Sequence, residues 1–464
     1  MGSRLRLTGT NGIGEVNGLP NLRWDPAFGF LYQYYSGVTP ARRKLLLIGP
    51  GNSYDPDFLE VDNDTPAGNG YRGLMAKYCI YLDQLRAHDW GALGKLFVFP
   101  VYGFGYNWSA SNRASGAKLA ARITEIIAEG KAVTGSCEKV ILVTHSMGGL
   151  VARAAMKLAG AESQVLGVVH GVQPAYGAPA AYMRMKAGFE GGGIEGKVTS
   201  RFLGPTGRDV TALLANSVGG LQLLPGKQYQ TSQGSTRWLT IPKQQGDPQL
   251  LPRTNDAFND IYRVPAEVAP AAGTGSTSNA YWGLVDPALL TPGVVTPPPA
   301  AAQAGPLDQE VLGVRAPSAP WSGYLANLAD AEAFLEDIGT YRHPKTWWFN
   351  GGDLDTAQTA SYELASNWVR SESYPTRAFR GFLRGEGGKE LKAELQDPAG
   401  SGDGTVPVMS SSFNGSLTPS PAPPANRTFA GLAHQPAYEN TDVRTWATAA
   451  ITAIAGQYVN ERHG

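Results

Sequence analysis

Short apolar runs alternate with polar, loop-forming segments in the first part of the chain. The runs cover residues 44–48, 96–100, 140–143 and 165–169, and glycine, proline or polar residues follow each one. Runs of this length predict strands that are buried on both faces, as in a parallel sheet.

The segments between these runs predict helices, because their apolar residues recur every three or four positions. The two clearest stripes are Leu74, Tyr78, Tyr81, Leu82 and Leu85, and then Leu119, Ile123, Ile126 and Ile127. We expect Gly130 to end the second of these helices. A further stripe from Val443 to Tyr458 predicts a last helix. Alternating strands and helices predict an α/β fold with a mostly parallel sheet and helices on both of its faces.

The regular alternation stops near residue 181 and resumes near residue 345. The intervening segment is rich in Gly, Ala, Pro, Ser and Thr, least regular between about residues 265 and 320. A long irregular insert in a compact domain is either functional or disordered. We predict an N-terminal extension (1–40), a first core part (41–180), a large inserted cap or lid (181–344) and a second core part (345–464). For the proline-rich middle of the cap, a flexible surface excursion is the alternative.

The run at residues 140–143 leads directly into His145, Ser146, Met147, Gly148 and Gly149. A serine between a buried strand and a helix is typical of a nucleophile elbow, in which a tight turn exposes the hydroxyl. The amide after the serine, that of Met147, then points at the space where an oxyanion would form. Thr144 replaces the first glycine of the usual G-x-S-x-G pattern. The alternative is a serine that only caps the following helix.

A serine nucleophile needs an imidazole to take its proton and a carboxylate to orient that imidazole. Among the six histidines, His434 is the predicted base, because it follows a short extended segment downstream of an aspartate in a glycine-hinged loop. That aspartate is Asp403, the predicted acid. Asp353 and Asp355 also follow an apolar strand and remain competitors for the same role.

Composition and motifs argue against several partners and cofactors. Lys plus Arg equals Asp plus Glu at 39 each, and no dense basic stripe is present, so nucleic acid is not an expected partner. No phosphate-cradling glycine loop occurs, and the acidic loop of Asp55, Asp57, Asp62 and Asp64 lacks EF-hand spacing. We expect no metal and no cofactor. Cys79 and Cys137 are too few for a disulfide framework. We also expect no secretory signal peptide and no transmembrane segment.

These features together resemble the lecithin:cholesterol acyltransferase-like branch of the α/β-hydrolases, which is similar to bacterial lipases and to GPI inositol-deacylase-type proteins. The matching pieces are Pro-Gly-Asn at 50–52, Tyr-Asn-Trp at 106–108, His-Ser-Met-Gly-Gly at 145–149 and Gly-Asp-Gly-Thr-Val at 402–406. The order Ser, Asp, His along the chain is also that of α/β-hydrolases. The resemblance implies an α/β-hydrolase fold, favours Asp403 over Asp353, and implies an oxyanion hole formed by the amides of Asn52 and Met147.

The sequence therefore predicts a serine carboxylic-ester hydrolase that acts on lipid or other apolar esters through an acyl-enzyme, with transient contact with a lipid surface. Acyl transfer to an alcohol is an alternative that the triad does not distinguish. A catalytically silent binding protein on the same fold is the non-enzymatic alternative. Some bacterial lipases that resemble this chain are antibacterial effectors of type VI secretion, which would imply an immunity protein as partner. We expect the enzyme in the cytoplasm of the producing cell, or exported without a signal peptide.

Overall fold

The computed structural model describes most of the chain from residue 76 onward and isolated pieces before it. The described residues are 3, 5–7, 15–16, 19–20, 22–24, 44, 48, 59–61, 71–72, 76–189, 204, 206–242, 246–266, 280, 282–290, 320–365, 380–384, 390–396, 399–415, 424 and 426–463. Much of the predicted irregular segment between residues 265 and 320 therefore lies outside the described residues.

A parallel sheet of four strands forms the first layer. Its strands are β8 (Val140–His145), β9 (Val165–Gly171), β12 (Thr346–Gly351) and β17 (Arg427–Phe429), and they are adjacent in chain order. All three pairings between neighbouring strands are parallel. The carboxyl ends of the four strands therefore lie at one edge of the sheet.

Helices cover both faces of this sheet, as the alternation of side chains along β9 demonstrates. Val168 packs in a cluster with Leu119 of α5 (Asn112–Thr134) and Val151 of α6 (Gly148–Lys157). Val169, the next residue, packs on the opposite face with Tyr81 of α3 (Ala76–Ala87) and Trp446 of α14 (Thr441–His463). Successive side chains of a strand point to opposite faces, so both faces of β9 are buried. The predicted α/β class with a parallel sheet is confirmed.

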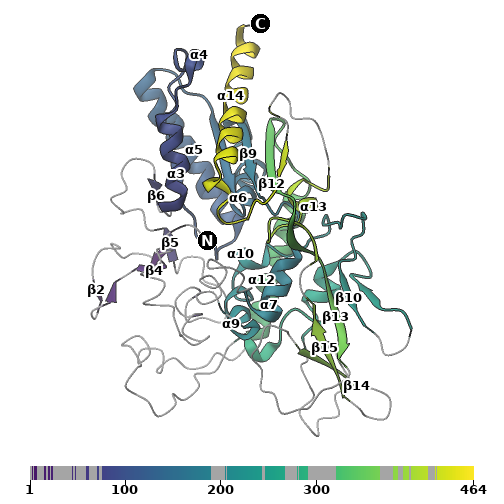
Figure 1. Cartoon of the computed structure of the whole chain (residues 1–464). Helices are drawn as coiled ribbons and strands as arrows, with labels where there is room; N and C mark the ends of the chain where they lie inside the picture. The colour runs from purple at the N-terminus through teal and green to yellow at the C-terminus, as the bar shows by residue number, and fades with distance from the viewer. Residues whose placement is uncertain are drawn as a thin grey trace.

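A second layer lies below the parallel sheet in Figure 1. We use this name for one mixed sheet and four helices. The sheet has the strand order β11-β10-β13-β15-β14, with β16 paired to β13. The strands are β10 (Leu239–Ile241), β11 (Gln249–Leu251), β13 (Leu354–Ala365), β14 (Arg380–Arg384), β15 (Glu390–Leu395) and β16 (Ala399–Gly402). The helices are α7 (Pro179–Ala187), α9 (Gly207–Leu214), α10 (Val218–Leu221) and α12 (Pro320–Ile338).

The second layer contains strands from two segments that were predicted to belong to different domains. Strands β10 and β11 belong to the predicted cap, whereas β13, β14 and β15 belong to the predicted second core part. They meet because β10 pairs in parallel with β13, with Leu239 opposite Ala360. The predicted boundary at residue 344 thus divides one sheet, and the domain limits remain a prediction.

The remaining described elements are short. They are β1 (Leu5–Leu7), β2 (Glu15–Val16), β3 (Leu19–Pro20), β4 (Leu22–Trp24), β5 (Leu59–Val61), β6 (Tyr71–Arg72), β7 (Gly103–Phe104), α4 (Gly91–Gly94) and α13 (Val408–Ser411), plus single helical turns at Glu162–Gln164, Phe258–Tyr262, Pro287–Leu289 and Ala437–Glu439. Cys79 and Cys137 are not joined by a disulfide. Among the described residues, no helix combines the length and the hydropathy needed to cross a bilayer.

Two local predictions are wrong. Residues 96–100 do not form a strand, because no described strand pairs with this segment. Val98, predicted to be buried, is 72% exposed. Helix α5 continues past Gly130 and ends at Gly135, whose φ of 75° is the left-handed conformation that terminates helices. Most of the predicted strand at residues 44–48 lies outside the described residues, which include only Lys44 and Ile48 of it.

Candidate active site

Ser146 lies at the carboxyl end of β8, in the turn before α6. Its φ of 53° is in the left-handed region, which a residue with a side chain adopts only when its surroundings enforce it. Two backbone hydrogen bonds enforce it here. The Ser146 amide donates to the Gly171 carbonyl of β9 over 2.8 Å, and the Ser146 carbonyl accepts the Gly149 amide over 2.9 Å. This strained strand-to-helix turn has the form of the predicted nucleophile elbow.

Thr144 fits where the usual elbow sequence has a glycine. Its side chain is buried, and its hydroxyl makes a 2.8 Å hydrogen bond with Nδ1 of His170 on the neighbouring strand. Space comes from the far side of the turn, since a Cβ on Gly148 would still be 4.0 Å from the Thr144 Cβ. Gly149 has no such room, because a Cβ there would lie 2.5 Å from the side-chain amide carbon of Gln173. The small residues that the elbow needs are therefore those after Ser146.

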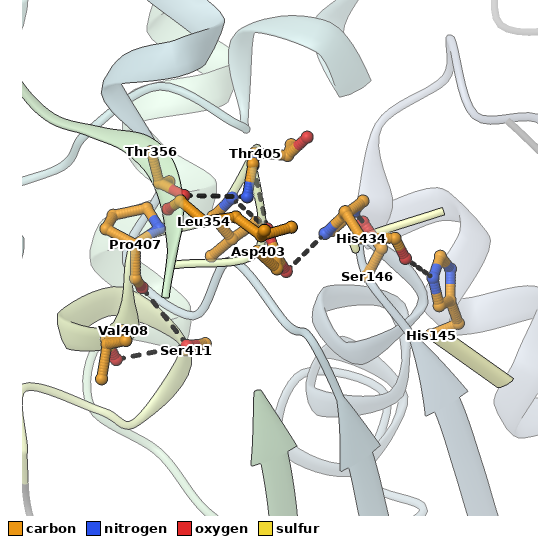
Figure 2. A network of polar contacts seen from close by, with 12 residues as sticks. His145, Ser146, Leu354, Thr356, Asp403, Thr405, Pro407, Val408, Ser411 and His434 are labelled. Atoms are coloured by element: carbon orange, nitrogen blue, oxygen red, sulfur yellow. Dashed lines mark hydrogen bonds and ion pairs between the residues drawn. The ribbon is translucent and has the colours of Figure 1, made fainter. Parts of the chain in front are cut away.

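Ser146, His434 and Asp403 form one row of hydrogen bonds (Figure 2). Nε2 of His434 is 2.7 Å from Oγ of Ser146, and Nδ1 of His434 is 2.8 Å from Oδ2 of Asp403. The three residues are far apart in the sequence and come from three different loops. The backbone adds a further contact, because the His434 amide donates to the Asp403 carbonyl over 2.9 Å.

The Asp403 carboxylate is buried and held on both oxygens. While Oδ2 faces His434, Oδ1 accepts the backbone amides of Thr405 at 2.9 Å and Val406 at 2.7 Å. Asp403 is 2% exposed and His434 is 4% exposed, so little water competes for these contacts. Gly351 at the end of β12 makes this packing possible, since a Cβ there would lie 2.8 Å from the Asp403 Cβ.

The competing aspartates do not face His434. The exposed Asp353 accepts the backbone amide of Gly431 over 2.5 Å, and so holds the loop that leads to the histidine. Asp355 is exposed on β13, opposite Ser401 of β16. Within the described residues, Asp403 is thus the carboxylate that contacts the His434 ring.

The other histidines near the site have different partners. Nε2 of His145 donates to the His434 backbone carbonyl over 2.8 Å. His170 is fully buried, and this burial, together with the nearby Arg153 cation, lowers its pKa to about 3. Burial also lowers the pKa of His343, whose Nδ1 accepts the Lys345 amide. Of the described histidines, His434 is the one whose ring contacts Ser146.

The predicted oxyanion hole is only partly described. Met147 is buried at the amino end of α6, and no described group accepts a hydrogen bond from its amide. A free amide at a helix start is suited to hold a developing negative charge. Asn52, the other predicted donor, lies outside the described residues, as do the four aspartates of the predicted acidic loop. No group of three metal-ligating side chains occurs in the described part of the chain.

Four residues that support the site were not predicted from the sequence. His145 and Tyr438 link the elbow to the His434 loop, and the Tyr438 hydroxyl donates to the Thr144 carbonyl over 2.9 Å. Thr356 and Arg184 contact the Asp403 loop from the second layer. His145 lies in the elbow motif, but that motif does not mark this contact, and the other three lie in no motif, because each of the four acts through a partner distant in the sequence.

The comparisons with known proteins agree with this architecture. Residues 116–187, which contain Ser146, match a protein family described as a PGAP1-like alpha/beta domain. A chain in the crystal structure of the Tle4-Tli4 complex is similar over 98% of this chain and 96% of its own length, with a TM-score of 0.68 and 21% identity. No curated protein sequence matches. The chain therefore has an α/β-hydrolase fold, as its predicted resemblance implies.

Proposed function

We propose that the protein is a serine carboxylic-ester hydrolase. The single observation that carries this proposal is the row of hydrogen bonds from Ser146 through His434 to Asp403, at 2.7 and 2.8 Å. A serine hydroxyl at this distance from an imidazole can transfer its proton as it attacks a carbonyl carbon. A silent binding protein on the same fold would have no use for a strained serine aligned with a buried histidine and carboxylate.

The reaction would follow from the geometry of the site. Ser146 Oγ attacks the ester carbonyl while His434 Nε2 takes its proton, and Asp403 Oδ2 stabilises the imidazolium that forms. The Met147 amide stabilises the oxyanion, together with the amide predicted for Asn52. His434 then protonates the leaving alcohol, and an acyl-enzyme remains on Ser146. Water, activated by the same histidine, attacks the acyl-enzyme and releases the acid.

Lipid esters are the proposed substrate class. Met147 and Leu150, beside the elbow, belong to one apolar core cluster that also contains Tyr182 and Tyr324 of the second layer. The protein is therefore apolar on this side of Ser146, which suits a substrate with an apolar acyl group. The match of residues 116–187 to a PGAP1-like domain is consistent with this class.

The test is hydrolysis of acyl esters from short to long chains, with a phospholipid and a triglyceride included. Ser146→Ala removes the nucleophile, and Ser136→Ala is the matched control, because Ser136 is exposed and lies outside the site. We expect turnover by the wild type and by the control, and none by Ser146→Ala. Labelling with a fluorophosphonate should follow the same pattern. Equal turnover by wild type and Ser146→Ala would refute the proposed nucleophile.

A second role is favoured by the comparison with solved structures. The similar chain was crystallised in the Tle4-Tli4 complex, and so occurs there with a second protein. We propose that this chain likewise acts as a secreted antibacterial lipase with an immunity partner. Export of the protein to the periplasm of a test bacterium should stop growth, and export of Ser146→Ala should not. Normal growth with active enzyme in the periplasm would reject the effector role and leave the esterase function standing.

A further inference from the structure

The loop that carries Asp403 is held from outside by two side chains of the second layer. Oγ1 of Thr356, on β13, accepts the backbone amide of Gly404 over 2.8 Å. Arg184, on α7, donates from Nη2 to Oγ1 of Thr405 over 3.0 Å. Gly404 and Thr405 directly follow Asp403, and the Thr405 amide is one of the two donors to Asp403 Oδ1.

Strand β13 connects this loop physically to the second layer. Its first residues pair with β16, which leads into Asp403, with Leu354 opposite Gly402. Its later residues pair with β10 and β15, with Ala360 opposite Leu239 and Tyr362 opposite Leu395. Strand β13 therefore both supports the loop of Asp403 and forms part of the sheet of the second layer. A shift of that sheet would move Thr356.

The hydrogen bonds of Thr356 have a defined direction. Its hydroxyl donates to the Leu354 carbonyl over 2.8 Å, so the oxygen is free to accept the Gly404 amide. The residue is fully buried, and a Cβ on Gly402 would lie 2.7 Å from both Oγ1 and Cγ2 of Thr356. The strand before Asp403 is thus packed tightly against Thr356. Loss of the acceptor would leave a buried amide without a partner, which favours a displaced loop.

We infer that Thr356 and Arg184 are positioning residues for Asp403, through which the placement of the second layer sets the catalytic competence of the triad. This inference rests on the proposed function. The imidazolium of His434 depends on a carboxylate at hydrogen-bond distance, and displacement of the reacting groups by about 1 Å can cost about 100-fold in rate. A substrate or partner that displaces the second layer would therefore change the rate of attack by Ser146.

The first experiment measures the rate of fluorophosphonate labelling of Ser146. Thr356→Val removes the acceptor at nearly constant volume, and Thr356→Ser keeps the oxygen. Thr359→Val is the matched control on the same strand, with a half-buried side chain outside the Asp403 loop. We expect labelling to be about tenfold slower in Thr356→Val, with near wild-type rates in the other two.

A double-mutant comparison separates positioning from a structural role. Thr356→Val made in an Asp403→Asn background should slow labelling little further, because Thr356 acts through a carboxylate that is then absent. A full, additive effect in that background would overturn the inference.

Arg184→Met tests the same idea from the other side and does not depend on the folding of Thr356→Val. It should slow labelling, whereas Arg237→Met, at an exposed arginine just before β10, should not. If the wild type is labelled and both Thr356→Val and Arg184→Met keep its labelling rate, the inference fails while the hydrolase function stands. If the wild type neither labels nor hydrolyses esters, both fail.

Discussion

His145 donates a hydrogen bond from Nε2 to the backbone carbonyl of His434 over 2.8 Å, so the residue before the serine holds the loop of the histidine that faces the serine. A second hydrogen bond crosses in the opposite direction, from the Tyr438 hydroxyl to the Thr144 carbonyl at 2.9 Å. Figure 2 shows His145 beside His434 and Ser146, away from Asp403. The distance between Oγ of Ser146 and Nε2 of His434 therefore depends on these two contacts.

Removal of the His145 contact should lower kcat. His145→Ala frees the His434 carbonyl, and we expect about a tenfold lower kcat with KM unchanged, since the ring no longer rests at its reacting distance. His145→Gln should recover part of the activity, because its amide can still donate to the carbonyl. Steady-state kinetics on one soluble ester measures both values. A wild-type kcat in His145→Ala would contradict a positioning role.

Gly351→Ala should lower both stability and activity, because the added methyl group collides with the loops that carry His434 and Asp403. A Cβ at this position would lie 2.3 Å from the Leu432 carbonyl oxygen and 2.8 Å from the Asp403 Cβ, and the first of these is backbone that cannot rotate away. The loops of His434 and Asp403 must then separate from β12. We expect a loss of about 1–3 kcal/mol in the free energy of unfolding and at least tenfold lower activity.

Gly404→Ala provides the contrast to that substitution. Gly404 has a φ of 84°, but a Cβ added there would have no atom within 4 Å, so alanine meets backbone strain without collision. Its stability should fall by about 1 kcal/mol. Urea denaturation of the two variants compares the effects, and equal losses would mean that collision at Gly351 is relieved by small shifts.

The residues around Ser146 were predictable because their signals are local. An apolar run, a small turn and a helix-forming segment follow one another within about twenty residues, and β8, the strained serine and α6 match that order. The contact between Asp403 and His434 was also predicted, although from the order of the residues and a family resemblance. The sequence alone left Asp353 open, since both aspartates follow a strand.

The missed features depend on contacts between distant segments. Residues 96–100 have the composition of a buried strand, but a strand also needs a neighbour, and composition does not contain that information. Thr356 and Arg184 precede the Asp403 loop by many residues and look like ordinary strand and helix residues. Their role arises only because β13 and α7 lie against that loop in the folded chain.

The choice between the two aspartates can be tested directly. Asp403→Asn leaves the shape intact but removes the charge that orients and stabilises the His434 imidazolium, so kcat should fall by about 10⁴-fold. Asp353→Asn keeps an oxygen that can accept the Gly431 amide, and we expect less than a threefold change. Steady-state kinetics of the two variants on the same ester distinguishes them. A larger loss in Asp353→Asn would reverse the assignment.

His170 predicts how stability depends on pH. Its burial lowers its pKa from 6.5 to about 3, so the folded protein keeps this ring neutral over a range in which the unfolded chain protonates it. The unfolded state therefore binds more protons below pH 6.5, and the free energy of unfolding falls as the pH decreases. For one such group the loss between pH 7.5 and pH 5 is about 2 kcal/mol.

His170→Asn isolates this contribution. Asparagine has no proton to gain in this range, and its amide can still form a hydrogen bond with the Thr144 hydroxyl that now contacts Nδ1 of His170. The variant should be less stable than the wild type at pH 7.5, because a smaller side chain leaves a gap in the core. Its further loss on acidification to pH 5 should be smaller by about 2 kcal/mol, since all other titrating groups are shared. Urea denaturation of both proteins at the two pH values measures the four free energies. Equal losses in the two proteins would mean that the buried ring of His170 accepts a proton in the folded state.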